Sequence, residues 1–224
     1  MVAVIACGAL GASIRQIVAR RRWDVELHCL PPLLHNRPQA IAPNVELLAR
    51  RLQSSGRSVV LAYADCGTYG ALDEVCERLQ IDRLRGLHCY DVYAGAETIT
   101  KLFDDVPGTY VLTDFLVRSF RRAVLTELGL DRHPELWSDY FGQYSRVVWL
   151  AQQPTPELES EARRIAGQFG LPLSILEVSV TALELELSRL LEGAPQATPE
   201  AKAARAQKTE QAAAVPVPGV ARGT

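Results

Sequence analysis

Short apolar runs alternate with amphipathic stretches along most of this chain, and the alternation limits the fold more than any other feature. A strand that is apolar on both faces belongs in a sheet covered by helices on each side. Strands that alternate with helices favour an α/β domain with a mainly parallel sheet. The predicted strands are 2–6, 24–30, 58–63, 83–88, 109–112, 146–150 and 173–178.

The stretches between these runs place apolar residues at helical spacing, with charged residues on the opposite face. We therefore expect one sheet of about six to seven strands, helices on both of its faces, and a single domain over residues 1–192. Residues 193–224 are rich in alanine and proline and contain no aromatic residue, so we expect a disordered tail. The helices are predicted around 14–18 and over 40–55, 71–79, 94–103, 115–128, 156–169 and 181–191, with another opening at His133-Pro134-Glu135.

Composition excludes two classes of partner. The net charge of -2 lacks the basic excess of a nucleic-acid-binding protein, so no nucleic-acid partner is expected. The apolar start of the chain, residues 1–6, is interrupted by Gly8 and then by arginines, too soon for a signal peptide or a membrane span. We expect a cytoplasmic protein without a membrane partner.

Three cysteines lie where a predicted strand ends and a helical pattern begins: Cys7, Cys66 and Cys89. Parallel strands end at the same edge of a sheet, so these side chains can meet although they are far apart in sequence. His35 follows the second strand, in a segment with three prolines that cannot be a regular helix or a central strand. Five cysteines without an export signal argue against a disulfide framework and favour metal ligation or thiol chemistry.

Three thiolates and an imidazole suit tetrahedral Zn(II), and sulfur ligands also suit iron or copper(I). We predict a metal centre, of zinc or iron, formed by Cys7, His35, Cys66 and Cys89, with sulfurs within roughly 4 Å of one another. The chain lacks the Cys-x-x-Cys pairs of common zinc motifs. The alternative is an accessory or interaction protein without metal, in which these cysteines only pack or undergo thiol redox cycling. His35 would then only fix its loop through a backbone hydrogen bond.

Other candidates are weaker. Cys76 has the helical spacing of a core residue. His28 and Cys29 are adjacent in a strand and point to opposite faces, so at most one of them is a ligand. A phosphate loop at Gly8 and Gly11 lacks both the dinucleotide fingerprint and the Walker lysine.

The motifs around these residues resemble those of domain-of-unknown-function family 1638 over most of residues 1–180. They are Ala6-Cys7-Gly8, Leu34-His35-Asn36-Arg37-Pro38, Tyr63-Ala64-Asp65-Cys66-Gly67, Arg85-Gly86-Leu87-His88-Cys89 and the segment 107–113. The resemblance selects the same four residues as metal ligands. His88 stands where the family commonly has aspartate, and it could support a ligand or replace one. The resemblance also implies a role in one-carbon or corrinoid-linked methyl metabolism, a corrinoid association, and a small molecule or methyl-transfer protein as partner.

Overall fold

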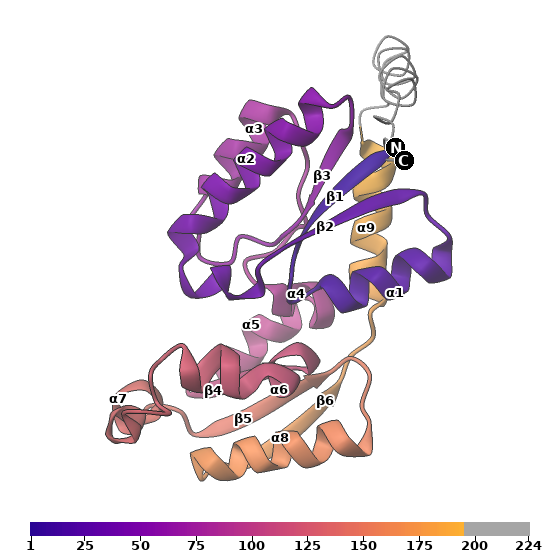
Figure 1. Ribbon diagram of the computed structural model, residues 1–224. Helices are drawn as coiled ribbons and strands as arrows, with labels where there is room; N and C mark the ends of the chain where they lie inside the picture. The colour runs from indigo at the N-terminus through magenta and orange to yellow at the C-terminus, as the bar shows by residue number, and fades with distance from the viewer. Residues whose placement is uncertain (195–224) are drawn as a thin grey trace, which may run out of the picture.

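The computed structural model contains two parallel three-stranded sheets, and it describes residues 1–194 (Figure 1). The expectation of one sheet of six to seven strands is therefore wrong, although six of the seven predicted strands form. The predicted tail lies outside the described residues from 195 onward. The first sheet has the order β2 (Val25–Leu30), β1 (Val2–Cys7), β3 (Ser58–Ala62), and the second has β4 (Thr109–Thr113), β5 (Arg146–Ala151), β6 (Leu173–Glu177).

The missing strand explains the division into two sheets. In the predicted strand 83–88, only Arg83 forms a bridge, to Leu61 of β3. Gly86 then adopts a φ of +111°, which ends the extended backbone. The chain continues into α4 (Cys89–Ala94) and α5 (Ala96–Asp105), and the next strand, β4, starts a new sheet instead of extending the first.

The first lobe consists of the β2-β1-β3 sheet between two pairs of helices. Figure 1 shows α2 (Ile41–Ser54) and α3 (Ala71–Leu79) on one side, and α1 (Gly11–Arg21) and α9 (Thr181–Gly193) on the other. The last helix, α9, returns from the second lobe, and its Leu183, Leu187 and Leu190 are buried in the core of the first. The Glu184 carboxylate fixes α9 to α1 by accepting hydrogen bonds from Arg20 and Arg21.

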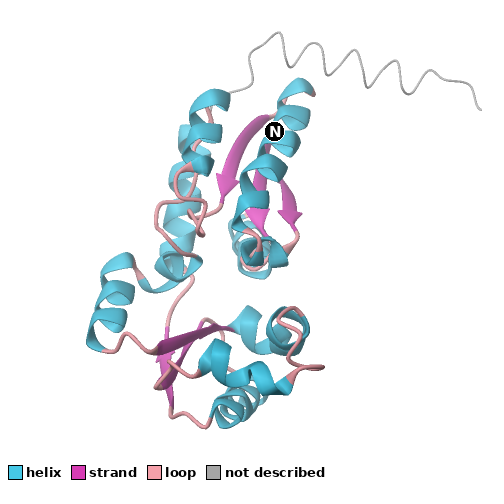
Figure 2. Ribbon diagram, turned by 90° about the vertical axis from the view of Figure 1, so that its left-hand side faces the viewer, coloured by secondary structure: helices cyan, strands magenta, loops and turns pink. Residues whose placement is uncertain are grey.

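The second lobe consists of the β4-β5-β6 sheet, and its strands alternate between two cores as their period of two requires. Leu112, Val147 and Trp149 pack toward α6 (Asp114–Phe120) and α8 (Pro156–Phe169), whereas Val111 and Val148 pack toward α5. Figure 2 shows these helices around the lower sheet. The helix predicted over 115–128 is α6 followed by a π-helical segment, Arg121–Thr126.

The remaining elements are short. The proline-rich segment after β2 forms two 3₁₀ turns, Pro32–Asn36 and Pro38–Ala40, and a third, Pro134–Leu136, precedes α7 (Trp137–Phe141). In the part of the chain that the structure describes, none of the helices has the length and apolar character needed to span a membrane.

Candidate metal centre

All four predicted ligands line one cavity, of about 230 Å³, at the carboxyl edge of the first sheet. Cys7 comes from the end of β1, His35 from the turn after β2, Cys66 from the loop after β3 and Cys89 from the start of α4. The opposite wall belongs to the second lobe. The other lining residues are Ala9, Gly67, His88, Tyr90, Thr113, Phe115 and Leu116.

Gly8 allows the loop after β1 to approach the loop after β2. A Cβ atom on Gly8 would lie 2.5 Å from the Leu30 carbonyl oxygen and 2.8 Å from Cδ of Pro32. Both neighbours are rigid, since one is backbone and the other a proline ring. The absence of a side chain at Gly8 thus lets the turn that contains His35 lie next to the end of β1 and Cys7.

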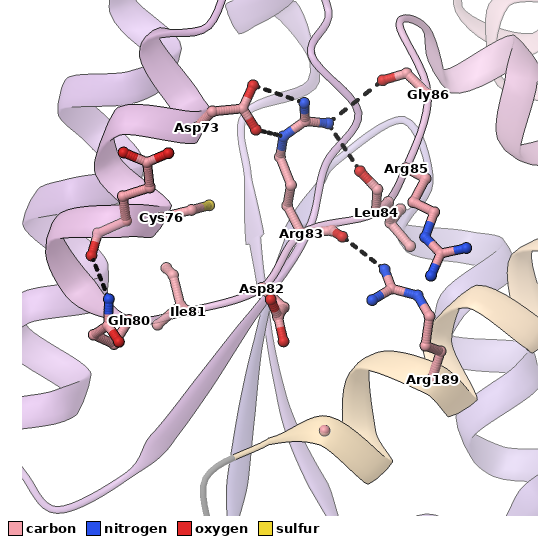
Figure 3. A pocket seen from close by; sticks show the side chains of 12 residues that line it. Asp73, Cys76, Gln80, Ile81, Asp82, Arg83, Leu84, Arg85, Gly86 and Arg189 are labelled. Atoms are coloured by element: carbon pink, nitrogen blue, oxygen red, sulfur yellow. Dashed lines mark hydrogen bonds and ion pairs between the residues drawn. The ribbon is translucent and has the colours of Figure 1, made fainter.

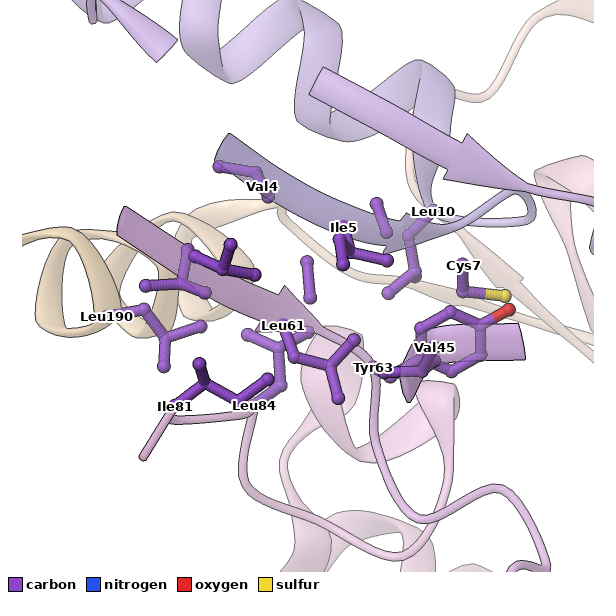
Figure 4. Packing of buried hydrophobic residues seen from close by; sticks show 14 of the residues in the cluster. Val4, Ile5, Cys7, Leu10, Val45, Leu61, Tyr63, Ile81, Leu84 and Leu190 are labelled. Atoms are coloured by element: carbon purple, nitrogen blue, oxygen red, sulfur yellow. The ribbon is translucent and has the colours of Figure 1, made fainter. Parts of the chain in front are cut away.

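Cys7 is 3% exposed, and burial raises the pKa of its thiol. The backbone amides of Ala9 and Leu10 and the hydroxyl of Tyr63 oppose this increase, because each favours a negative sulfur. Figure 4 shows the Tyr63 hydroxyl directed at the Cys7 sulfur. This buried hydroxyl has no hydrogen-bond partner of good geometry among the described residues, so it is a donor available to a thiolate at Cys7.

Backbone hydrogen bonds hold Cys66 beside the segment before Cys89. The amide of Cys66 donates to the Leu87 carbonyl (2.8 Å), and the amide of Asp65 donates to Gly86 (3.1 Å). Cys66 has a φ of +53°, a left-handed conformation that is uncommon for a residue with a side chain. Burial, and then the neighbouring Cys7, raise the pKa of the Cys66 thiol to about 12, although the Cys89 amide opposes them.

Cys89 is the first residue of α4, and Asp91 fixes the backbone before it. The Asp91 carboxylate accepts hydrogen bonds from the amides of Leu87 (2.7 Å) and His88 (3.1 Å). Burial raises the pKa of the Cys89 thiol well above its usual value, and the nearby Cys66 and Cys7 raise it further. The three thiols therefore influence one another's ionisation.

His35 presents a neutral imidazole to the cavity. Its Nδ1 atom is 2.5 Å from the Pro32 carbonyl oxygen, which can only accept, so we assign the proton to Nδ1. Burial lowers the pKa of His35, and the Pro32 carbonyl offsets part of this decrease. The lone pair of Nε2 is left for a ligand, and a backbone carbonyl on the other ring nitrogen is the usual arrangement of a metal-binding histidine.

Three thiols and an imidazole are donors that suit a zinc or iron ion, but in this structure the four side chains do not converge on a common coordination point. Among residues 1–194, no three His, Cys, Asp or Glu side chains form a ready-made metal site. The four candidate side chains must therefore turn inward to coordinate an ion at distances of about 2.0–2.3 Å. His88 lines the same cavity and is exposed.

The other two cysteines lie elsewhere. Cys29 is exposed on β2, where its sulfur is 3.8 Å from Nη1 of Arg15, and His28 lies 3.0 Å from Glu26. Cys76 is 8% exposed in α3 and belongs to the core of the first lobe, as its spacing predicts.

A larger cavity of about 750 Å³ lies away from this site, between α3 and α9 (Figure 3). Two of its arginines have partners. Arg83 pairs with Asp73 at 2.6 and 2.9 Å, and Arg189 binds both the Arg83 carbonyl and Glu186. The contact between Arg189 and the Arg83 carbonyl attaches α9 to the first lobe, so part of this cavity wall has a structural role.

Comparison with known proteins identifies a family. The family model described as "Protein of unknown function (DUF1638)" matches residues 29–187. The chain belongs to the DUF1638 family. This confirms the family that its motifs resemble, and the matched part of this DUF1638 protein includes His35, Cys66 and Cys89, while Cys7 precedes it. No curated protein and no solved structure matches the chain.

Sequence reasoning missed Tyr63 and the contribution of the second lobe. The β1–β3 register pairs Ala6 with Ala62 and so places Tyr63 level with Cys7. The available sequence signal was that Tyr63, like Cys7, stands at the end of an apolar run predicted as a strand. Phe115 and Leu116 reach the cavity only because the two lobes pack together, and no local pattern indicates that packing.

Proposed function

We propose that the protein binds one zinc or iron ion through Cys7, His35, Cys66 and Cys89, in the cleft between its two lobes. The observation that carries this proposal is that four donors from four separate segments line a single small cavity. Purely structural cysteines would have no reason to collect there with a histidine whose Nε2 lone pair is free.

Metal binding would require the thiols to ionise. Burial raises the pKa of Cys7, Cys66 and Cys89, and nearby sulfurs raise each pKa further, so the three thiols are protonated at neutral pH without a positive charge among them. A divalent ion would reverse this effect, because it is bound by thiolates and displaces their protons. The Tyr63 hydroxyl would then donate a hydrogen bond to the Cys7 thiolate.

A role in chemistry follows from the position of the cavity. Ligands of parallel α/β sheets bind outside the carboxyl ends of the strands, and this cavity lies there. With all four protein ligands bound, a tetrahedral ion has no open position, so it would act as a Lewis acid or activate water only by accepting a fifth ligand or releasing one of the four. The finer proposal, that this serves one-carbon or corrinoid-linked methyl metabolism with a methyl-transfer partner, is supported by the family resemblance of the motifs.

Thiol redox chemistry is the second candidate, because Cys66 and Cys89 lie beside each other and both are free thiols. Their raised pKa values disfavour redox exchange in the absence of a nearby cation. The thiolate is the reactive form in exchange, and reactive cysteines have a lowered pKa.

Metal content decides between these candidates. We expect about one zinc or iron per chain in protein purified without a metal-affinity tag, measured by elemental analysis. Cys7→Ser, Cys66→Ser and Cys89→Ser should each lose the metal, and the matched controls Cys29→Ser and Cys76→Ser should retain it. Wild-type protein without metal, in which mild oxidation links Cys66 to Cys89, would instead support redox cycling.

A further inference from the structure

A second cavity continues the cysteine cavity along the cleft between the lobes. It has a volume of about 680 Å³, within the range of small-molecule sites. Ala9 and Phe115 line both cavities, so a ligand in one lies next to the other. The walls come from α1 of the first lobe, α6 of the second, and the loop after β5.

Three arginines give this cavity a positive charge. Arg15 comes from α1, Arg118 from α6 and Arg122 from the π-helical segment. All three are exposed, and none forms an ion pair with a carboxylate of residues 1–194, whereas the less exposed Arg57 and Arg83 do. The guanidinium of Arg15 makes only a long contact, 3.8 Å, with the Cys29 sulfur.

The one carboxylate among the lining residues, Asp114, is directed to other partners. It accepts hydrogen bonds from Nε1 of Trp149 (2.9 Å), the amide of Gln152 (3.2 Å) and the amide of Gln153 (2.9 Å). These donors stabilise its charge, and it forms no ion pair with the arginines within the described residues. The three arginines and this one carboxylate therefore leave the lining of the cavity with a net positive charge.

Neutral polar groups complete the walls. The hydroxyls of Ser13 and Ser119 line the cavity, where Ser13 lies 3.0 Å from the Tyr93 hydroxyl and Ser119 donates to the Phe115 carbonyl. The side-chain amide of Gln153 donates to Gln16 across the cleft. The donors left for an anion are the guanidinium groups, which bind carboxylates and phosphates through paired N–H groups.

We propose that this arginine cavity, lined by Arg15, Arg118 and Arg122, binds the carboxylate or phosphate group of a small-molecule substrate, and that the rest of the substrate extends past Ala9 and Phe115 to the candidate metal centre. The binding of the anion depends on the arginines alone. The assignment of that anion as a substrate rests on the proposed metal function.

The test measures binding of two probes, inorganic phosphate and succinate, by calorimetry at constant ionic strength, with chloride as the reference anion. The probes distinguish a phosphate from a carboxylate. The variants are Arg118→Gln and Arg122→Gln, and the control is Arg51→Gln, an exposed arginine on α2 outside the cleft. Circular dichroism in chloride checks that every variant is folded.

We expect wild-type protein to show saturable binding of at least one probe. Binding should be roughly ten-fold weaker in each cleft variant, because each variant loses one charged hydrogen-bonding group. Binding to the Arg51→Gln control should be unchanged. Absence of saturable binding, or equal weakening in Arg51→Gln, would overturn the inference. Metal analysis of the same samples and of Cys66→Ser separates the two proposals. Anion binding without metal would refute only the metal function, and metal without anion binding would refute only the arginine site.

Discussion

Replacing Gly8 by alanine tests whether the loops after β1 and β2 are in direct contact beside the candidate metal centre. Gly8 does not have a positive φ, so alanine is compatible with its backbone and the cost arises from contact alone. The added Cβ would lie 2.5 Å from the Leu30 carbonyl oxygen, whereas non-bonded heavy atoms prefer about 3.5–4.0 Å. The two loops must therefore separate by roughly 1 Å.

Overpacking of this kind costs about 1–3 kcal/mol, and the smaller conformational entropy of unfolded alanine returns about 0.4–1 kcal/mol. Because neither the Leu30 carbonyl nor the Pro32 ring can rotate away, we expect the upper part of the range. The free energy of unfolding of Gly8→Ala, measured by urea denaturation with circular dichroism, should fall by about 2 kcal/mol. Its metal content should fall as well, since His35 moves away from Cys7.

Gly167→Ala is the matched control. Gly167 is exposed inside α8, and an added Cβ there would meet no atom within 4 Å. Alanine should therefore stabilise the protein by about 0.5–1 kcal/mol, as in other exposed helix interiors. A Gly8→Ala variant as stable as the wild type would refute the close approach of the two loops.

Three further predictions concern single side chains. Asp114→Ala should lower the free energy of unfolding by about 3 kcal/mol in urea denaturation, because the fully buried indole N–H of Trp149 loses its acceptor. Exposed Asp104→Ala is the control, and an equal effect of both variants would contradict the hydrogen bond between Trp149 and Asp114. Burial raises the pKa of Asp65, but hydrogen bonds from Thr68, Gly70 and Tyr69 lower it more, so its folded pKa lies below the unfolded one. The ionised Asp65 carboxylate therefore stabilises the fold fully above a pH of about 4, and this stabilisation is lost as the pH falls through the folded pKa. The difference in free energy of unfolding between wild type and Asp65→Asn should shrink in acid. A difference that stays constant down to pH 2 would argue against this linkage. Cys76→Ala should destabilise the core mildly, with metal content unchanged, and a variant that loses metal would show that Cys76 serves the site.

Local pattern predicted most of the secondary structure but not its division into two sheets. β1 and β3 were identifiable because they are buried on both faces and so are apolar, apart from Ser58 at the start of β3. The predicted helix over 156–169 matches α8 because Thr155 caps it and Gly170 follows it in the left-handed conformation. The strand predicted over 83–88 failed because Gly86 and the hydrogen bonds of the loop 65–66 draw the chain out of the sheet.

The part of the candidate site formed by residues at strand ends was predictable from the sequence. Cys7 and Cys66 follow strands of one parallel sheet, so the fold class alone places them at one edge. The second lobe contributes Phe115 and Arg118 to the cavity walls. Their position there depends on contacts between distant segments and on the return of α9 to the first lobe. Sequence periodicity carries no information about that packing, so the arginine cavity was not predictable.

The most direct test of the account is X-ray absorption spectroscopy of the metal in the purified protein. We predict one ion with three sulfur ligands at about 2.3 Å and at least one nitrogen ligand at about 2.0–2.1 Å. When Cys66→Ser retains metal, or is loaded with it, the ion should have one sulfur ligand fewer than in the wild type. Cys76→Ser should leave the spectrum unchanged. A metal coordinated only by nitrogen and oxygen, or a protein that takes up no zinc or iron when either is supplied under reducing conditions, would contradict the proposed centre.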